Sequence, residues 1–384
     1  MGQDDGTGKP APAQQFELND EQRIAWLRLI RSENVGAATF RDLINHCGSA
    51  QVALEMLPEL AKRGGRLSKV RITTEAEAVK ELADITRHGA RLIGIGEPDY
   101  PPILRQMEHA PPLVTVRGNT NVFTLPAIAI VGSRNASMVG IKMARTLAEG
   151  LGSDGFAIVS GLARGVDRAA HEAALPRGTV AVLAGGIDQA YPPENQGLLT
   201  SIEEGGTGCS ITEQPFGLSP RARDFPKRNR LIAGLAIGLV VVEAAKRSGS
   251  LITARLAGEI GRQVFAVPGS PLDPRSAGTN GLIRDGAILV TSAADVLEAV
   301  NPMLDDDPGS HTQPSLLEPN DSFTDPPPET VREKILSLLG PTPTDVDDII
   351  AETRAKPSDV FLVILELDLA GRIERHSGNR VSLI

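Results

Sequence analysis

The sequence is poor in cysteine and in aromatic residues. Its 384 residues include two cysteines, two tyrosines, one tryptophan and nine phenylalanines. Cys47 and Cys209 are far apart and form no CxxC pair, which excludes a disulfide scaffold and a zinc ribbon. The scarcity of aromatic side chains argues against a surface that stacks many bases in a row.

Long apolar runs and clusters of metal-binding residues are also missing. The longest notable apolar run, residues 231–242, is interrupted by Gly234 and Gly238, whereas a helix needs about 20 apolar residues to span a bilayer. Residues 1–15 lack an apolar stretch and are predicted to be a disordered tail rather than a signal peptide. The six histidines are scattered, so we expect no metal site, no cofactor and no catalytic triad.

Charge is distributed unevenly along the chain. The formal net charge is −9, and residues 301–384 account for all of it, with 16 acidic and 7 basic residues. Residues 1–300 carry 32 of each sign. Within the acidic part, residues 301–328 hold six acids, seven prolines and no lysine or arginine, a composition typical of a linker.

Hydrophobic periodicity divides the rest into three predicted domains. Residues 16–120 are dominated by helical patterns, with two short strands at 91–94 and 113–117. Residues 121–300 alternate short apolar strands with helices, which indicates a doubly wound, Rossmann-like parallel sheet of α/β class. Its strands are expected at 127–131, 156–159, 180–183, 209–212, 238–242, 263–267 and 287–290. Residues 329–384 read as three helices and a hairpin, the order of a winged helix.

Small residues followed by an arginine come directly after the first two strands of the predicted parallel sheet. Ligands of such sheets bind at the carboxyl ends of the strands, where helix N-termini present free N–H groups. Glycine lets a backbone come close, and arginine offers a bidentate fork to a phosphate. The candidate phosphate-binding residues are Gly132, Ser133, Arg134, Ser160, Gly161 and Arg164. A plain strand–turn–helix corner is the alternative interpretation at each position.

A concentrated basic segment lies further along the chain. Five bases occur within ten residues and surround one aromatic residue, Phe225. This pattern suits a loop that neutralises a phosphate backbone and stacks one base. Its candidate residues are Arg221, Arg223, Phe225, Lys227, Arg228, Asn229 and Arg230. The alternative is a solvated basic loop that balances the acidic tail.

An ordered set of motifs then carries a family likeness. It consists of VGSRNAS at 131–137, SGLARGVDRAAH at 160–171, AVLAGGIDQAYPPEN at 181–195, FPKRNRLIAGLA at 225–236, VVEAAKRSGSLITA at 241–254, VFAVPGSP at 264–271 and GTNGLIRDGA at 278–287. Together these motifs closely resemble the DNA-processing protein A (DprA/Smf) family. The helices before them resemble that family's small helical, SAM-like domain, and the tail resembles its winged-helix domain.

The resemblance implies a cytoplasmic bacterial protein that binds single-stranded DNA and has no enzymatic activity. Such a protein protects incoming DNA, loads the RecA recombinase during natural transformation or recombination, and forms a homodimer. The resemblance also places Gly132, Ser133 and Arg134 at a phosphate and Phe225 beside the strand. Ala222 stands where some relatives have a lysine, which leaves open whether Arg221 or Arg223 supplies that charge.

Two other functions compete with this interpretation. One is a phosphoribohydrolase of the LOG type, which acts on nucleoside monophosphates and carries a catalytic glutamate in a P-G-G-x-G-T-x-x-E segment. The comparable segment here, residues 247–255, has no acidic residue at that place. The other is an interaction scaffold whose basic loop binds an acidic protein. The third helix of the tail, residues 358–370, has no lysine or arginine and favours a protein contact over DNA reading.

Overall fold

The computed structural model describes residues 17–305, 327–376 and 378–384. The predicted tail at 1–15 and most of the predicted linker at 301–328 lie outside these residues. Helix α12 (Ala293–Asp305) continues past residue 300, so the first residues of the predicted linker belong to this helix. Within the described ranges, no helix is long and apolar enough to cross a membrane.

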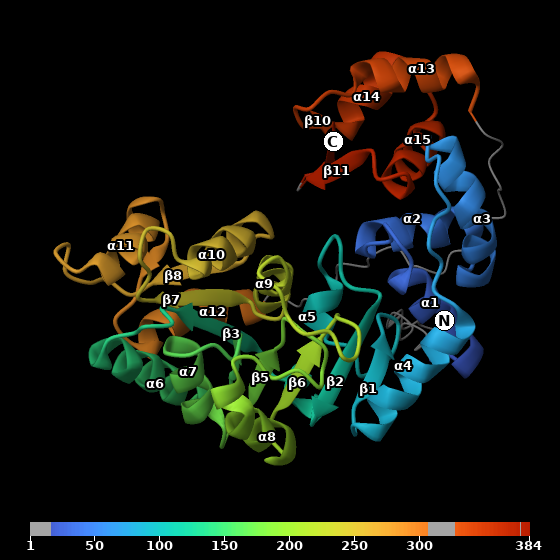
Figure 1. Ribbon diagram of the computed structural model, residues 1–384. Helices are drawn as coiled ribbons and strands as arrows, with labels where there is room; N and C mark the ends of the chain where they lie inside the picture. The colour runs from blue at the N-terminus through green and yellow to red at the C-terminus, as the bar shows by residue number, and fades with distance from the viewer. Residues whose placement is uncertain (1–16, 306–326, 377) are drawn as a thin grey trace, which may run out of the picture.

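The centre of the molecule is a largely parallel sheet with the order β1-β2-β6-β5-β4-β3-β7-β8-β9 (Figure 1). Its seven parallel strands are β3 (Ala127–Gly132), β4 (Ala157–Ser160), β5 (Thr179–Val182), β6 (Cys209–Thr212), β7 (Gly238–Val242), β8 (Gln263–Ala266) and β9 (Ile288–Leu289). The first two strands, β1 (Arg91–Gly94) and β2 (Leu113–Gly118), extend the sheet in antiparallel pairing at β6. The α/β prediction is confirmed.

Helices cover both faces of this sheet, as Figure 1 shows. One face carries α6 (Met138–Ser153), α7 (Val166–Ala174) and α8 (Gln196–Glu204), and the other carries α9 (Asp224–Gly234) and α10 (Gly249–Glu259). Helix α11 (Ala277–Arg284) follows β8. Because the central strands are buried on both faces, their sequences are unbroken apolar runs, as in the fully buried β7.

The order of the strands reverses next to β3. Chain order runs from β3 to β6 in one direction, whereas β7 pairs with β3 on its other side and starts the run to β9. A crevice forms at such a switch point, outside the carboxyl ends of the strands. The loops after β3, β4 and β7 therefore meet at one place.

The N-terminal domain is a helical unit joined to the sheet edge. It contains α1 (Asp20–Arg31), α2 (Ala37–Cys47), α3 (Ala50–Arg63) and α4 (Glu75–Arg87), and α5 (Pro102–Arg105) lies between β1 and β2. Asn19 caps α1 through a reciprocal bond with Gln22. Arg31 donates to the carbonyl oxygen of Glu213 (3.0 Å), which ties this domain to the loop after β6.

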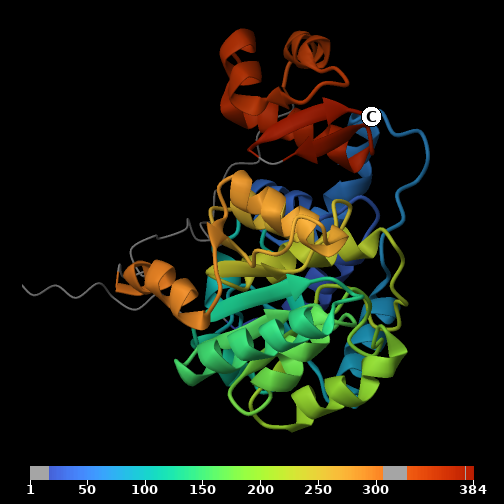
Figure 2. The ribbon, with the colours of Figure 1, turned by 90° about the vertical axis from the view of Figure 1, so that its left-hand side faces the viewer.

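The C-terminal module is a winged helix. It comprises α13 (Glu329–Leu338), β10 (Thr344–Asp345), α14 (Val346–Thr353), α15 (Pro357–Leu369), β11 (Ile373–His376) and β12 (Arg380–Leu383). Figures 1 and 2 place it above the N-terminal helices and away from the parallel sheet. The three-helix and hairpin order that the sequence predicts is confirmed.

Candidate nucleic-acid interface

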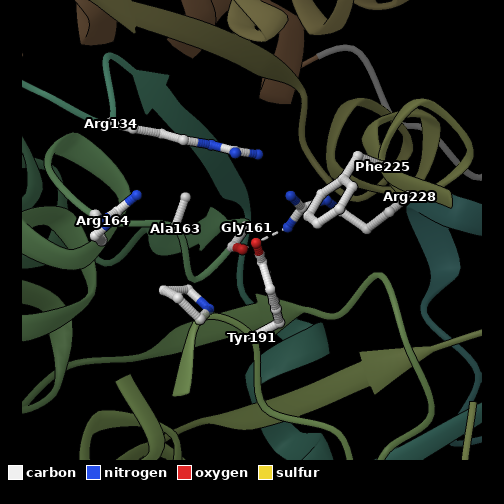
Figure 3. Close-up of a pocket in the computed structure, with 8 residues that line it drawn as sticks. Arg134, Gly161, Ala163, Arg164, Tyr191, Phe225 and Arg228 are labelled. Atoms are coloured by element: carbon white, nitrogen blue, oxygen red, sulfur yellow. Dashed lines mark hydrogen bonds between the residues drawn. The ribbon is translucent and has the colours of Figure 1, made fainter. Parts of the chain in front are cut away.

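A cleft of about 770 Å³ opens at the carboxyl ends of β3, β4 and β7. Its volume lies in the range of small-ligand sites. The loops after these strands and the first turns of α9 and α10 line it. Lining residues include Gly132, Ser133, Arg134, Asn135, Tyr191, Phe225, Arg228, Asn229, Arg247, Ser248 and Thr253. A smaller hollow beside it is lined by Gly161, Ala163 and Arg164 as well (Figure 3).

The ring of Phe225 is the centre of this site. The guanidinium carbon of Arg134 lies 5.2 Å from the ring centroid, and that of Arg228 lies 5.7 Å away. The rings of Tyr191 and Phe225 form an edge-to-face contact, with 5.4 Å between their centroids. Figure 3 shows Arg134 extending across the hollow toward Phe225. Since its own neighbours already cover Phe225, this ring is a poorer platform for an incoming base than the sequence predicts.

Arg228 is a buried residue and not a surface cation. Its Nη1 donates to the carbonyl oxygens of Gly161 (2.5 Å) and Val182 (2.9 Å). Burial lowers its pKa to about 10, and Asp167 opposes that shift. The side chain therefore connects α9 to the ends of β4 and β5. The charged guanidinium also lines the cleft.

The glycines of the two candidate phosphate loops are required by packing. A Cβ at Gly132 would lie 1.9 Å from the carbonyl oxygen of Val242 on the neighbouring strand. A Cβ at Gly161 would lie 2.1 Å from Nη1 of Arg228. Both glycines allow protein atoms to approach, so close approach of a ligand is not needed to explain them.

A carboxylate already occupies the N-terminus of α6. Ser137 caps the helix by accepting from the N–H of Gly140 (3.0 Å), and its own N–H and hydroxyl donate to Glu243. Glu243 directly follows β7 and has a positive φ of 55°. The N–H groups that were predicted to be free at this helix end therefore already have a protein acceptor in part. The negative charge of Glu243 also offsets the positive end of the helix dipole.

Some side chains of the predicted basic segment are exposed, and others are bonded to protein groups. Arg221, Arg223 and Lys227 are exposed around the start of α9, and the neighbouring Pro220 and Ala222 line the cleft. Arg230 points elsewhere, because it donates to the carbonyl oxygen of His109 (2.9 Å) and pairs with Glu213. Ser160 is fully buried and donates to the carbonyl oxygen of Ile130 (2.6 Å). The structure thus gives Arg230 and Ser160 structural contacts away from the cleft.

Tyr191 and Arg247 are among the cleft residues that the sequence-based candidates leave out. Tyr191 is 45% exposed and lines both hollows. Arg247 is exposed in the loop between β7 and α10. Both follow parallel strands at their carboxyl ends, which is the signal that could have identified them. Arg134 and Arg247 make no ion pair with any residue that the structure describes, whereas Arg164 lies 3.5 Å from Glu194.

The titratable groups near the cleft do not form an acid–base pair. Asp167 is buried and accepts from the N–H groups of Gly161 (3.1 Å) and Ala163 (3.3 Å), so it holds the β4–α7 loop rather than capping α7. Burial raises its pKa. His171 is fully buried against Thr179 (2.7 Å), and burial lowers its pKa to about 3. In the ranges described, no three metal-binding side chains come together.

Comparison with known proteins places this site in a family. Residues 91–301 match the family model of DNA recombination-mediator protein A. Residues 20–83 match a DprA-like N-terminal HHH domain, and residues 319–379 match a DprA winged helix domain. The three models follow one another in the order of the three folded parts.

Individual relatives and structures agree with the models. The chain is 40% identical to protein Smf of Escherichia coli (strain K12) over 290 residues, which cover 74% of this chain and 75% of that one. It is 46% identical to DNA processing protein DprA of Streptococcus pneumoniae over 200 residues, covering 52% and 70%.

Two solved structures are similar as well. The crystal structure of S. pneumoniae DprA aligns with a TM-score of 0.55 at 38% identity, over 68% of this chain and 86% of that one. The structure that describes the single-stranded DNA binding mode of DprA from Helicobacter pylori aligns with a TM-score of 0.50 at 28% identity, over 56% and 96%.

Proposed function

Because this chain belongs to the DprA/Smf family of DNA processing proteins, we propose that it binds single-stranded DNA in the cleft at the carboxyl ends of β3, β4 and β7. The observation that carries the proposal is that two cations without an ion pair among the described residues line the same cleft as two aromatic rings. Arg134 and Arg247 line this cleft from two different loops, and Phe225 and Tyr191 line it as well. Cations neutralise phosphates, and aromatic rings contact bases of any sequence.

The roles of the side chains follow from their exposure. Arg134, Arg247 and the exposed bases Arg221, Arg223 and Lys227 neutralise successive phosphates. Tyr191 supplies the ring on which a base stacks, since its face is not shared with a guanidinium as that of Phe225 is. Arg228 and Asn229 position the start of α9, and Asn229 contacts the carbonyl oxygen of Gly249 on α10 (3.5 Å).

The cleft favours a single strand over a duplex. Tyr191 lines this cleft, and the face of an unstacked base can lie on its ring, whereas the faces of paired bases are covered by their neighbours in the duplex. Hydrolysis forms no part of the proposal, because His171 and Asp167 are buried structural groups. In line with the family, we further propose that the protein protects incoming strands and delivers them to the RecA recombinase as a homodimer.

Fluorescence anisotropy with a labelled poly-dT strand, titrated at several salt concentrations, tests this function. We expect tight binding, a steep loss of affinity with salt, and much weaker binding of a matched duplex. Equal affinity for both forms, or no binding at low salt, would remove the proposal. Release of free base from AMP would replace it with the hydrolase interpretation.

A further inference from the structure

The third helix of the winged-helix module is apolar on two sides. Val360, Val363, Ile364 and Leu367 pack in the core of the module itself. Leu362, Leu365 and Leu369 belong instead to the hydrophobic core that contains the N-terminal helices. A helix that is apolar all round is a buried helix. Figure 1 shows α15 lying beside α2 and α3, so two domains share this helix.

The backbones of the two domains approach each other closely at Gly64, just after α3. A Cβ built at this position would lie 1.9 Å from the carbonyl oxygen of Glu366 in α15. Gly64 has ordinary right-handed helical dihedral angles, which an alanine adopts without strain. Only the winged-helix module therefore requires glycine there.

Polar contacts surround this apolar core on several sides. Two N-terminal side chains bond the end of α15: Asn34 donates to the carbonyl oxygen of Leu369 (3.1 Å), and Thr39 donates to Asp368 (2.8 Å). Two arginines of the module bond the end of α3, since Arg332 donates to the carbonyl oxygen of Arg63 and Arg372 to that of Gly64, both at 3.2 Å.

An ion pair also joins the winged-helix module to the N-terminal domain. Arg375 of β11 lies between Asp42 of α2 (2.7 Å) and Asp368 of α15 (2.8 Å). Although burial opposes the charge of Arg375, these two carboxylates raise its pKa above the usual value. Arg332 pairs with Glu366, whose side chain is completely buried. That pair lies within the module and orients Arg332, whose other terminal nitrogen donates across the interface to the carbonyl oxygen of Arg63.

The composition of α15 does not suit a DNA groove. In helix-turn-helix proteins the corresponding helix enters the major groove and contacts phosphates and base edges through basic and polar side chains. Helix α15 contains no lysine or arginine and carries Asp359, Glu366 and Asp368. Asp359 and Asp368, the acidic residues of α15 that are not fully buried, would face polyanionic DNA with the wrong sign.

We propose that the winged-helix module is a protein-docking clasp, in which α15 takes the α2–α3 face of its own N-terminal domain as its ligand. The clasp holds the N-terminal domain in one arrangement and contacts the turn between α1 and α2 through Asn34 and the first turn of α2 through Thr39. Any ligand of that turn is excluded while the module is docked. This inference is independent of whether the cleft binds DNA.

Gly64→Ala in the full-length protein is the direct test. The added methyl group meets a backbone oxygen of α15, so we expect deuterium exchange of α15 and of α2–α3 to rise at least tenfold. Gly36→Ala is the matched control, because a Cβ at Gly36 in the same domain meets nothing within 4 Å. Equal exchange in the wild type and Gly64→Ala would overturn the clasp.

A charge exchange separates undocking from simple misfolding. Asp42→Arg places a cation against Arg375 and is expected to release α15. Adding Arg375→Asp, together with Asp368→Asn so that the new carboxylate does not face Asp368, is expected to restore the protection of α15. Failure of the second change to restore protection would contradict the paired role of these residues. Protection that rises with protein concentration would show docking on a second copy and overturn the intrachain contact.

Duplex binding distinguishes a clasp from a masked DNA reader. Affinity of Gly64→Ala for a duplex should equal that of the wild type, because the released helix is acidic. A gain of tenfold or more would mean that α15 reads DNA when it is free, and would refute the proposal.

Discussion

Gly161 and Arg228 interlock beneath the candidate DNA site. The guanidinium of Arg228 donates to the carbonyl oxygen of Gly161 at 2.5 Å, and a Cβ on that glycine would lie 2.1 Å from the donating nitrogen. One residue comes from the end of β4 and the other from α9. Their contact holds α9 against the end of β4 beside the cleft.

This contact predicts that Arg228→Ala mainly affects stability. Removing the cation leaves the buried carboxylate of Asp167 without its balancing charge, and we expect the free energy of unfolding to fall by about 3 kcal/mol. Arg134 is exposed, so Arg134→Ala should change that free energy by less than about 0.5 kcal/mol. Urea unfolding of both variants measures the difference, and equal losses would contradict the burial of Arg228.

Arg134→Ala should instead weaken DNA binding. Loss of one phosphate contact is expected to lower the slope of log K against log salt by about 0.7 and the affinity for poly-dT by about tenfold at low salt. Arg284→Ala is a suitable control, since this exposed arginine of α11 does not line the cleft. An unchanged salt slope in Arg134→Ala would remove this residue from the strand path.

Tyr191 should contribute through its ring and not through its hydroxyl. Tyr191→Phe is expected to bind poly-dT like the wild type, whereas Tyr191→Ala should lose about tenfold, the effect of one stacked base. The loss should disappear when an abasic strand of equal length is used. The same anisotropy titration covers all three proteins. Equal losses on normal and abasic strands would show that Tyr191 only shapes the site.

Gly161→Ala should disturb both properties together. The new methyl group displaces Arg228, so we expect a lower midpoint of urea unfolding and weaker binding of poly-dT. Gly258→Ala in α10 meets nothing within 4 Å and serves as the control. Weaker binding at unchanged stability would indicate that the glycine contacts DNA itself.

His171 makes stability depend on pH. Its pKa is about 3 in the folded protein, below the ordinary value of 6.5, because burial disfavours the charged ring. Below pH 6.5 the histidine of the unfolded chain binds a proton, whereas that of the folded chain stays neutral. The free energy of unfolding therefore falls as the pH drops below 6.5. The loss at pH 5 should be about 2 kcal/mol. In His171→Asn the urea midpoint should vary less between pH 7 and 5, and an identical pH dependence would refute this role.

Local pattern was sufficient for most of the fold. Every strand expected in the parallel sheet is present, since a strand buried on both faces needs an unbroken apolar run, as at residues 238–242. The winged-helix order of three helices and a hairpin also follows from local patterns. The loops after β3 and β4 were placed at the cleft because parallel strands end at the same edge of the sheet.

The roles of individual cations could not be predicted in the same way. In sequence, Arg228 and Arg230 are indistinguishable from Lys227, yet one is buried under Gly161 and another pairs with Glu213. Tyr191 is separated from Phe225 by more than thirty residues in the chain and contacts its ring in space. Burial and pairing depend on neighbours that are distant in the chain.

The sequence by itself determined the order of the domains, the parallel sheet and the acidic character of the third winged-helix helix, because these follow from composition and from the spacing of apolar residues. Only the tertiary structure decided which arginines remain free for a ligand and what covers the second apolar side of α15. Those outcomes rest on contacts such as Arg228 with Gly161 and Arg375 with Asp42, which join segments that the linear pattern does not relate.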